Sequence, residues 1–209
     1  MNLNKFLSDL TRRVLLKHMI QELVQKNIIQ YQYKIHPESF IGILGLHGKF
    51  ERGISEIVTH LAQQLQCNYF LFQTPIHFPS SWIHPEAVPE LKQFLDSVQF
   101  IISIHGTSRT DLFVGGQHQT TITMSINALR SVKWNKKIEV FSAIRNQDIV
   151  GHLAGLNEEN LVNYPLRKGI QLELPMFMRI NRGEQIKLYC IMNKLYPELV
   201  KIIKGDSDG

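Results

Sequence analysis

Two histidines and a glutamate stand where an α/β protein commonly presents metal ligands. His47 directly follows the apolar run 41–46, and Glu51 lies four residues further on. His105 follows a second apolar run at 101–104, and both histidines precede a glycine, which lets the backbone approach a ligand closely. Two imidazoles and one carboxylate, with a fourth position left for water, are typical of a catalytic zinc site. The alternative is that each histidine only caps a strand and bonds to backbone.

A third strand end could add an acid–base group. Glu173 lies inside the otherwise apolar segment GIQLELP at 169–175. A carboxylate buried in such a segment must be paired or must do chemistry, because an unpaired buried charge is costly. Beside a metal it could serve as a general base. Alternatively Gln171 and Glu173, which share one face of an alternating strand, point to solvent.

Several polar residues on expected loops are candidates for binding a substrate. Arg109, Arg145 and Arg167 could hold carboxylates through two parallel hydrogen bonds, although a solvated surface arginine is the simpler interpretation of each. Asn163 and His77 are further loop candidates. The sequence has no GxSxG elbow, no Walker loop and no GxGxxG motif, and neither of its two cysteines has a histidine near it in sequence.

Composition predicts an ordinary water-soluble globular domain. The chain has 209 residues, 44% of them hydrophobic and 20% charged, and a net charge of +5. The positive excess suits an anionic substrate, but the basic residues form no dense run, so a nucleic-acid partner is not expected. We see no signal peptide and no run of apolar residues long enough for a membrane span, and we expect a cytoplasmic protein.

Alternating strands and helices predict an α/β fold. We expect one domain with a mixed, mainly parallel twisted sheet flanked by helices. An N-terminal amphipathic helix would occupy the region 1–34, the catalytic domain 35–204 and a polar tail 205–209. The expected strands are 40–46, 68–74, 99–104, 111–114, 137–142 and 169–174, and the expected helices are 3–30, 54–66, 88–97, 118–132, 157–163 and 181–203.

Five sequence blocks resemble one known family. They are HGKFERGISEI at 47–57, SIHG at 103–106, VGG at 114–116, NLVN at 160–163 and GIQLEL at 169–174. Their order and spacing are similar to those of the phage-type poly-γ-glutamate hydrolases, which are small zinc peptidases with a fold like that of zinc carboxypeptidases and related phosphorylase/hydrolase-like proteins. The resemblance covers residues from about 40 to 180.

The resemblance implies one Zn²⁺ per chain, held by His47, Glu51 and His105, with Glu173 as the catalytic carboxylate. It further implies cleavage of amide bonds that join glutamate units through the side chain, and TPIHF at 74–78 suggests a substrate contact for His77. The first block departs from the family, because three residues instead of four separate the two ligands and Arg52 replaces a usual proline. No arginine other than Arg52 lies between Glu51 and His105, where carboxypeptidases carry an oxyanion-binding arginine.

The sequence therefore predicts a zinc-dependent amide hydrolase acting on an acidic peptide or γ-glutamyl substrate. Arg109 and Arg167 are our choices for binding substrate carboxylates. One alternative is an enzyme of related fold that deacylates N-formylglutamate or another acylamino acid. A second is a non-catalytic binding module with a vestigial site. Zinc content discriminates the last alternative from the first two.

Overall fold

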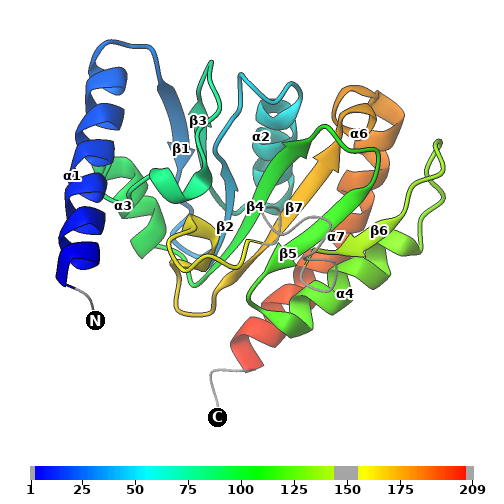
Figure 1. Cartoon of the computed structure of the whole chain (residues 1–209). Helices are drawn as coiled ribbons and strands as arrows, with labels where there is room; N and C mark the ends of the chain where they lie inside the picture. Colours follow the sequence, from blue (N-terminus) through cyan, green and yellow to red (C-terminus); the bar gives the residue numbers. More distant parts are fainter. Residues whose placement is uncertain (1–2, 144–154, 206–209) are drawn as a thin grey trace.

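The protein folds around one mixed sheet with the strand order β1-β3-β2-β4-β7-β5-β6 (Figure 1). The computed structural model describes residues 3–143 and 155–205. The strands in chain order are β1 Gln30–Lys34, β2 Ile41–Gly45, β3 Asn68–Gln73, β4 Phe100–Thr107, β5 Leu112–Gly116, β6 Val140–Ser142 and β7 Gly169–Pro175. This arrangement confirms the predicted α/β class with a mixed sheet.

The four central strands run parallel, and the chain changes direction between β2 and β4. From β2 the chain passes through a helix to β3 on one side, and then returns through a second helix to β4 on the other side. Strand β7 lies parallel to β4, while β1 and β5 are antiparallel to their neighbours β3 and β7. In such a sheet, ligands bind outside the carboxyl ends of the strands that flank the change of direction.

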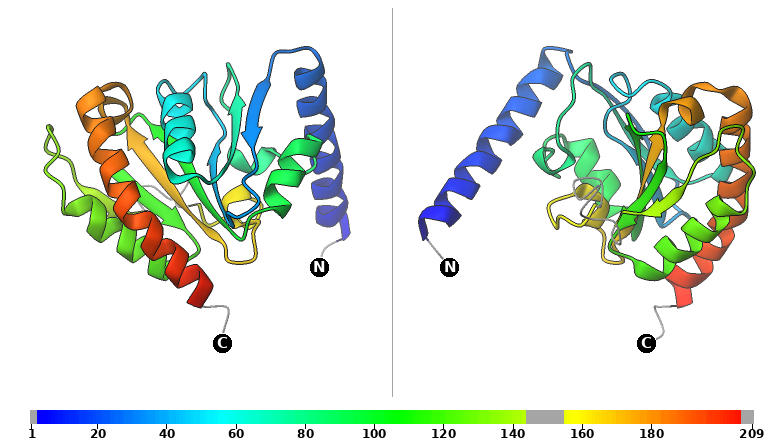
Figure 2. Two further views of the ribbon diagram at one scale, coloured as in Figure 1. Left: turned by 180° about the vertical axis from the view of Figure 1, so that it is seen from behind. Right: turned by 45° about the vertical axis from the view of Figure 1, so that its right-hand side comes forward.

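Helices cover both faces of the sheet (Figure 2). On one face α2, α4 and α7 pack on a large apolar cluster, and on the other α1, α3 and the short 3₁₀ helix η3 pack on a second cluster. The helices are α1 Leu3–Gln25, α2 Ile54–Leu65, α3 Pro89–Asp96, α4 Gln119–Arg130, α6 Met176–Ile180 and α7 Arg182–Gly205, with 3₁₀ turns η1 Ser80–Trp82 and η3 Leu161–Asn163. Within the described ranges no helix has the length and apolar character needed to cross a membrane.

Side chains along β4 and β7 point alternately to the two faces of the sheet, and this places the candidate site residues on one of them. Ile102 and Ile104 belong to the cluster under α2, α4 and α7, whereas Ile101 belongs to the opposite cluster. Successive side chains of a strand point to opposite faces. Ser103 and His105 therefore lie on the side of Ile101, and the register of the parallel pair sets Gln171 and Glu173 beside them.

Several element boundaries differ from the sequence prediction. The first helix was expected to reach residue 30 but ends at Gln25, because Asn27 adopts a left-handed conformation (φ 56°) and the chain then turns into β1. Strand β4 runs to Thr107 instead of residue 104, so His105 belongs to the strand. The expected helix at 157–163 is only the turn η3, and the closing helix is preceded by the separate short helix α6. Strand β1, at the end of the region 1–34, pairs with β3 in the sheet. The division of the chain after residue 34 stays a prediction.

Candidate metal centre

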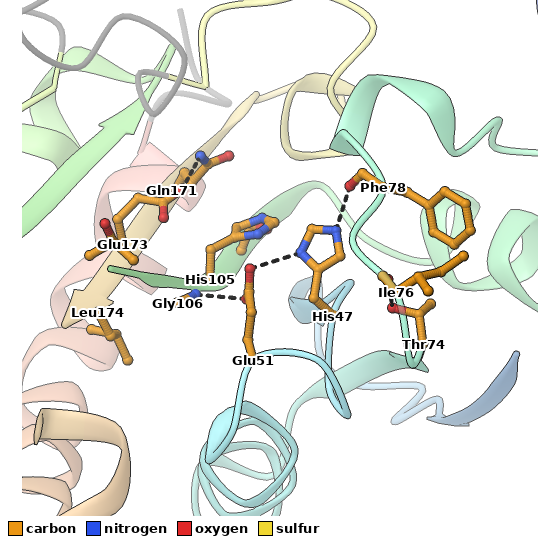
Figure 3. Close-up of polar contacts among 12 residues, drawn as sticks. His47, Glu51, Thr74, Ile76, Phe78, His105, Gly106, Gln171, Glu173 and Leu174 are labelled. Atoms are coloured by element: carbon orange, nitrogen blue, oxygen red, sulfur yellow. Dashed lines mark hydrogen bonds and ion pairs between the residues drawn. The ribbon is translucent and has the colours of Figure 1, made fainter. Parts of the chain in front are cut away.

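A tight turn after β2 brings Glu51 back to His47. The Glu51 N–H donates to the His47 carbonyl over 2.7 Å, so this stretch forms a helical-type turn. Residues four apart in such a turn lie on the same face. Accordingly His47 Nδ1 lies 3.1 Å from Glu51 Oε1 (Figure 3). Three intervening residues are therefore sufficient to place the two side chains together, despite the family's usual four.

Glycine at position 48 is required by close packing around this turn. The Gly48 N–H donates to the carbonyl of Phe72 in β3 over 2.8 Å. A Cβ at Gly48 would lie 2.5 Å from the hydroxyl of Ser55, and that hydroxyl donates to the Gly48 carbonyl. The turn is thus held against β3 on one side and against the start of α2 on the other.

His105 completes a group of three potential ligands. His47, Glu51 and His105 each offer one atom, these atoms lie within 4.8 Å of one another, and all three side chains are buried. The rings of His47 and His105 are 5.3 Å apart between centroids. Among the described residues, this is the group of histidine, cysteine and acidic side chains that could hold a metal ion.

Both rings use Nε2 for a neighbouring protein atom. His47 Nε2 lies 2.6 Å from the Phe78 carbonyl, and because a carbonyl only accepts, Nε2 carries the proton. His105 Nε2 lies 2.9 Å from the Ser103 hydroxyl. Each ring is thereby oriented by a contact outside the cluster, as is usual for metal-binding histidines.

The contact between His47 and Glu51 is the feature that best fits a metal ion. With Nε2 protonated, the Nδ1 of a neutral His47 presents a lone pair to the Glu51 carboxylate, and Nδ1 is a buried atom without a hydrogen-bond donor in the structure. Two buried acceptors that face each other need a cation or a shared proton between them. The residues present therefore fit a divalent metal at this position.

Burial and neighbouring groups favour the metal-binding ionisation states of His105 and Glu51. Burial lowers the pKa of His105 to about 4, because the charged imidazolium is poorly solvated there. Burial alone would raise the pKa of Glu51, but His47, His105 and the Gly106 N–H outweigh it, and the pKa is lowered. The Gly106 N–H donates to Glu51 Oε2 over 2.7 Å. A neutral imidazole and an ionised carboxylate are the metal-binding forms.

Glu173 lies next to His105 in the register of β4 and β7 and is buried, not solvent-facing. Gln171 Nε2 donates to Glu173 Oε1 over 2.7 Å, and Asn160 Nδ2 donates to Gln171 Oε1 over 3.0 Å. Asn160 Oδ1 accepts from the Val162 N–H, so the orientation of each amide in this relay is fixed. Burial first, and then the charge of Glu51, raise the pKa of Glu173 well above its ordinary value.

Arg179 was not predicted as a site residue, yet it lies directly behind the cluster. Its side chain is buried, and it donates to the carbonyls of Leu174, Arg52 and Thr107. Its charge acts on both Glu51 and Glu173. In sequence Arg179 is a single basic residue within MFMRI at 176–180, and the only available signal was an arginine in an apolar segment directly after a strand.

The predicted substrate-binding residues lie in different places. The His77 ring stacks on that of His47 at 4.6 Å between centroids, and His77 is exposed. The Arg109 guanidinium lies 6.0 Å from the ring centroid of Phe113, which pairs with Glu173 in the sheet. The structure therefore brings His77 against a potential metal ligand and Arg109 beside the strand neighbour of Glu173.

Asn163 and Arg167 hydrogen-bond to segments other than the three potential ligands. The buried Asn163 amide donates to the carbonyls of Gly155 and Asn157 and so supports its own loop. The Arg167 N–H donates to the carbonyl of Gln99, which immediately precedes β4, so Arg167 lies at the opposite end of the sheet from His105. The remaining candidate, Arg145, lies outside the described residues.

Comparison with known proteins identifies the family and the fold. Residues 17–190 match the family model described as poly-gamma-glutamate hydrolase. A solved bacteriophage poly-gamma-glutamate hydrolase is 20% identical, with a TM-score of 0.67 over 84% of this chain and 91% of the other. The zinc-free apo form of YNDL is 16% identical, with a TM-score of 0.67 over 82% of this chain and 90% of the other. No curated protein matches the chain.

Proposed function

Because this chain belongs to the poly-gamma-glutamate hydrolase family, we propose that it hydrolyses γ-glutamyl amide bonds with the help of one zinc ion. His47, Glu51 and His105 would hold the ion. The observation that carries the proposal is the buried Nδ1 of His47, which faces the Glu51 carboxylate and has no hydrogen-bond donor. Bound zinc would polarise the scissile carbonyl and lower the pKa of a water molecule toward neutrality.

Neighbouring residues would orient the three ligands and keep the His105 ring neutral. The Phe78 carbonyl and the Ser103 hydroxyl orient the two imidazoles through Nε2. The lowered pKa of His105, caused mainly by burial, keeps its ring neutral at physiological pH. The Gly106 N–H holds Oε2 of Glu51, which leaves Oε1 directed at His47.

Glu173 would move the proton of the reaction. Gln171 binds its Oε1, so Oε2 is the atom left to accept a proton from the attacking water. The raised pKa of Glu173, caused first by burial, allows the carboxyl to retain that proton and then donate it to the leaving nitrogen. The water oxygen is added to the carbonyl carbon, the C–N bond breaks, and a carboxylic acid and an amine result.

Substrate carboxylates would be bound by residues around this centre. Arg109 is the arginine candidate that lies beside Phe113 and hence on the side of Glu173. His77 stacks on the metal-binding ring of His47 and is exposed to an incoming substrate. An acidic substrate suits a protein with a net charge of +5.

Metal analysis combined with the Glu173→Gln variant tests the proposal. We expect about one zinc per chain in wild type and in Glu173→Gln, because the variant keeps all three ligands. We expect kcat on γ-linked glutamyl peptides to fall about 10²- to 10⁴-fold, because an amide cannot take the proton. Glu198→Gln, which changes an exposed carboxylate on α7, should keep the wild-type kcat.

The outcomes separate the proposal from its alternatives. Protein that holds no zinc after growth in zinc-rich medium would instead be a binding module. Zinc-loaded protein that cleaves N-acylated single amino acids but not γ-linked oligomers would be an acylamino-acid hydrolase. Full turnover by Glu173→Gln would remove Glu173 from the mechanism while leaving the metal site intact.

A further inference from the structure

Three segments that carry the site converge on a single guanidinium group. Arg179 Nε donates to the Leu174 carbonyl over 3.1 Å, directly after Glu173. One terminal nitrogen donates to the Arg52 carbonyl over 2.9 Å, directly after Glu51, and the other contacts the Thr107 carbonyl over 3.4 Å, two residues after His105. The ends of β7 and β4 and the turn after β2 are thus joined through one side chain.

Two glycines make room for this arrangement. A Cβ at Gly106 would lie 2.5 Å from the guanidinium carbon of Arg179, so β4 needs a glycine where the planar group lies against it. Gly53 has φ +90°, and a Cβ there would overlap the Arg179 carbonyl. The Arg179 carbonyl accepts from Gln185 Nε2, which fixes the backbone end of the same residue. The guanidinium therefore occupies a fitted position between the segments.

The burial and contacts of Arg179 favour a structural role over direct substrate binding. The side chain is buried, with a relative exposure of 5%. Nε and both terminal nitrogens are already directed at backbone carbonyls. Arginine can satisfy three separate acceptors because its donors spread over a rigid plane, whereas the donors of lysine share one nitrogen.

We propose that Arg179 is a positioning residue that holds the Glu51 turn, the His105 strand end and the Glu173 strand end at the spacing needed for metal binding. The inference rests on the proposed zinc site but assigns a role to a residue outside it. The charge of Arg179 also acts on Glu51 and Glu173 and compensates two buried carboxylates. Loss of the guanidinium releases Gly106, whose N–H otherwise fixes Glu51 Oε2.

Zinc affinity of Arg179→Met and Arg179→Lys, measured by competition with a chelator, tests the proposal. We expect the dissociation constant to rise about 10- to 100-fold in Arg179→Met, as for other groups that orient metal ligands. The dissociation constant of Arg179→Lys should lie between those of wild type and Arg179→Met, since lysine keeps the charge but reaches fewer carbonyls. Arg130→Met is the matched control, because Arg130 donates from Nε and Nη2 to the carbonyl of Val140 in β6, and β7 and β5 lie between β6 and β4 in the sheet.

Hydrogen exchange in metal-free protein supplies a second readout. The Gly106 amide should exchange at least about tenfold faster in Arg179→Met and Arg179→Lys than in wild type, and should be unchanged in Arg130→Met. If Arg179→Met does not fold, Arg179→Lys carries both measurements. A folded Arg179→Met with wild-type zinc affinity and wild-type Gly106 exchange overturns the inference and leaves the proposed function intact. Wild type without zinc affinity overturns the proposed function, and the exchange measurement then decides the role of Arg179.

Discussion

At the scale of single residues, the position of one proton on His47 organises the site. The Phe78 carbonyl places that proton on Nε2, which leaves the lone pair of Nδ1 directed toward Glu51. A carbonyl from a loop between β3 and α3 therefore determines what the turn after β2 can bind. The same loop carries His77 against the face of the His47 ring, so the proposed substrate contact and the orientation of His47 come from one segment.

The relay behind Glu173 predicts a change in pH dependence. Replacing Gln171 by Leu removes the hydrogen bond that favours the ionised form of Glu173, so the pKa of Glu173 rises further. A general base must be ionised, and we therefore expect the acid limb of the kcat profile to move to higher pH by about one unit. The profile of kcat against pH, measured at saturating γ-glutamyl peptide, gives the shift.

Two further variants control for this effect. Asn160→Ala removes only the donor to Gln171 and should move the acid limb in the same direction by less. Gln93→Leu, on the exposed side of α3, should leave the profile unchanged. An acid limb that stays in place in Gln171→Leu would mean that Glu173 is not the titrating base.

Several residues of the candidate site could be singled out from sequence because each is out of place in its surroundings. A histidine between an apolar run and a glycine has few structural explanations, as at His47 and His105, and the same holds for a glutamate inside an apolar strand, as at Glu173. The burial of Glu173 could not be predicted, because Gln171 and Glu173 alternate as an exposed strand face would. The loop around η3 covers that face, and Asn160 in it satisfies Gln171.

At the scale of elements, the antiparallel strand β5 depends on its last glycine. Gly116 has φ +109°, and a Cβ there would overlap the carbonyl of Gly169 at the start of β7. We expect Gly116→Ala to lower the free energy of unfolding by at least about 2 kcal/mol, because both strain and overlap must be relieved. Urea denaturation of the metal-free protein measures this difference.

Gly183→Ala is the matched control. Gly183 lies in the first turn of α7, and its nearest neighbour to an added Cβ is a side-chain oxygen at 3.3 Å. Alanine favours helix over glycine by about 1 kcal/mol, so stability should be retained or slightly increased. Equal stability of Gly116→Ala and wild type would show that β5 can shift without cost.

Element types were predictable and their ends were not. The sequence predicted α2, β3 and α4 within two residues of their observed bounds, because each helix packs an apolar stripe on the sheet and β3 is a compact run of mostly apolar residues within it. The first helix was drawn too long, since Ile28 and Ile29 continue its apolar spacing although Asn27 has already ended it. Arg179 was missed for a related reason: its partners are three backbone carbonyls from distant segments, and backbone acceptors leave no pattern in a sequence.

At the scale of the whole molecule, the two sides of the sheet have different tasks. The side under α2, α4 and α7 is a continuous apolar core, whereas the other side combines an apolar cluster with the polar residues of the site. The first helix belongs to the second side, through the buried Ile20 and its partly buried neighbours Leu23 and Val24. That side also contains a cavity of about 790 Å³ between α1 and the loops at 82–86 and 157–164, and Asn160 lines it.

Weakening the packing of α1 on the sheet should lower the stability of the protein without changing its zinc affinity. Ile20 is 1% exposed, so Ile20→Ala should lower the free energy of unfolding by about 2–5 kcal/mol through lost burial and a cavity. Val14→Ala, at a position 46% exposed on the same helix, should change it by less than about 0.5 kcal/mol. Zinc affinity should be unchanged in both, because the three potential ligands come from β4 and the turn after β2. Denaturation of the metal-free protein and chelator competition on the folded protein measure the two quantities separately, and a weaker zinc affinity in Ile20→Ala would show that α1 supports the metal centre itself.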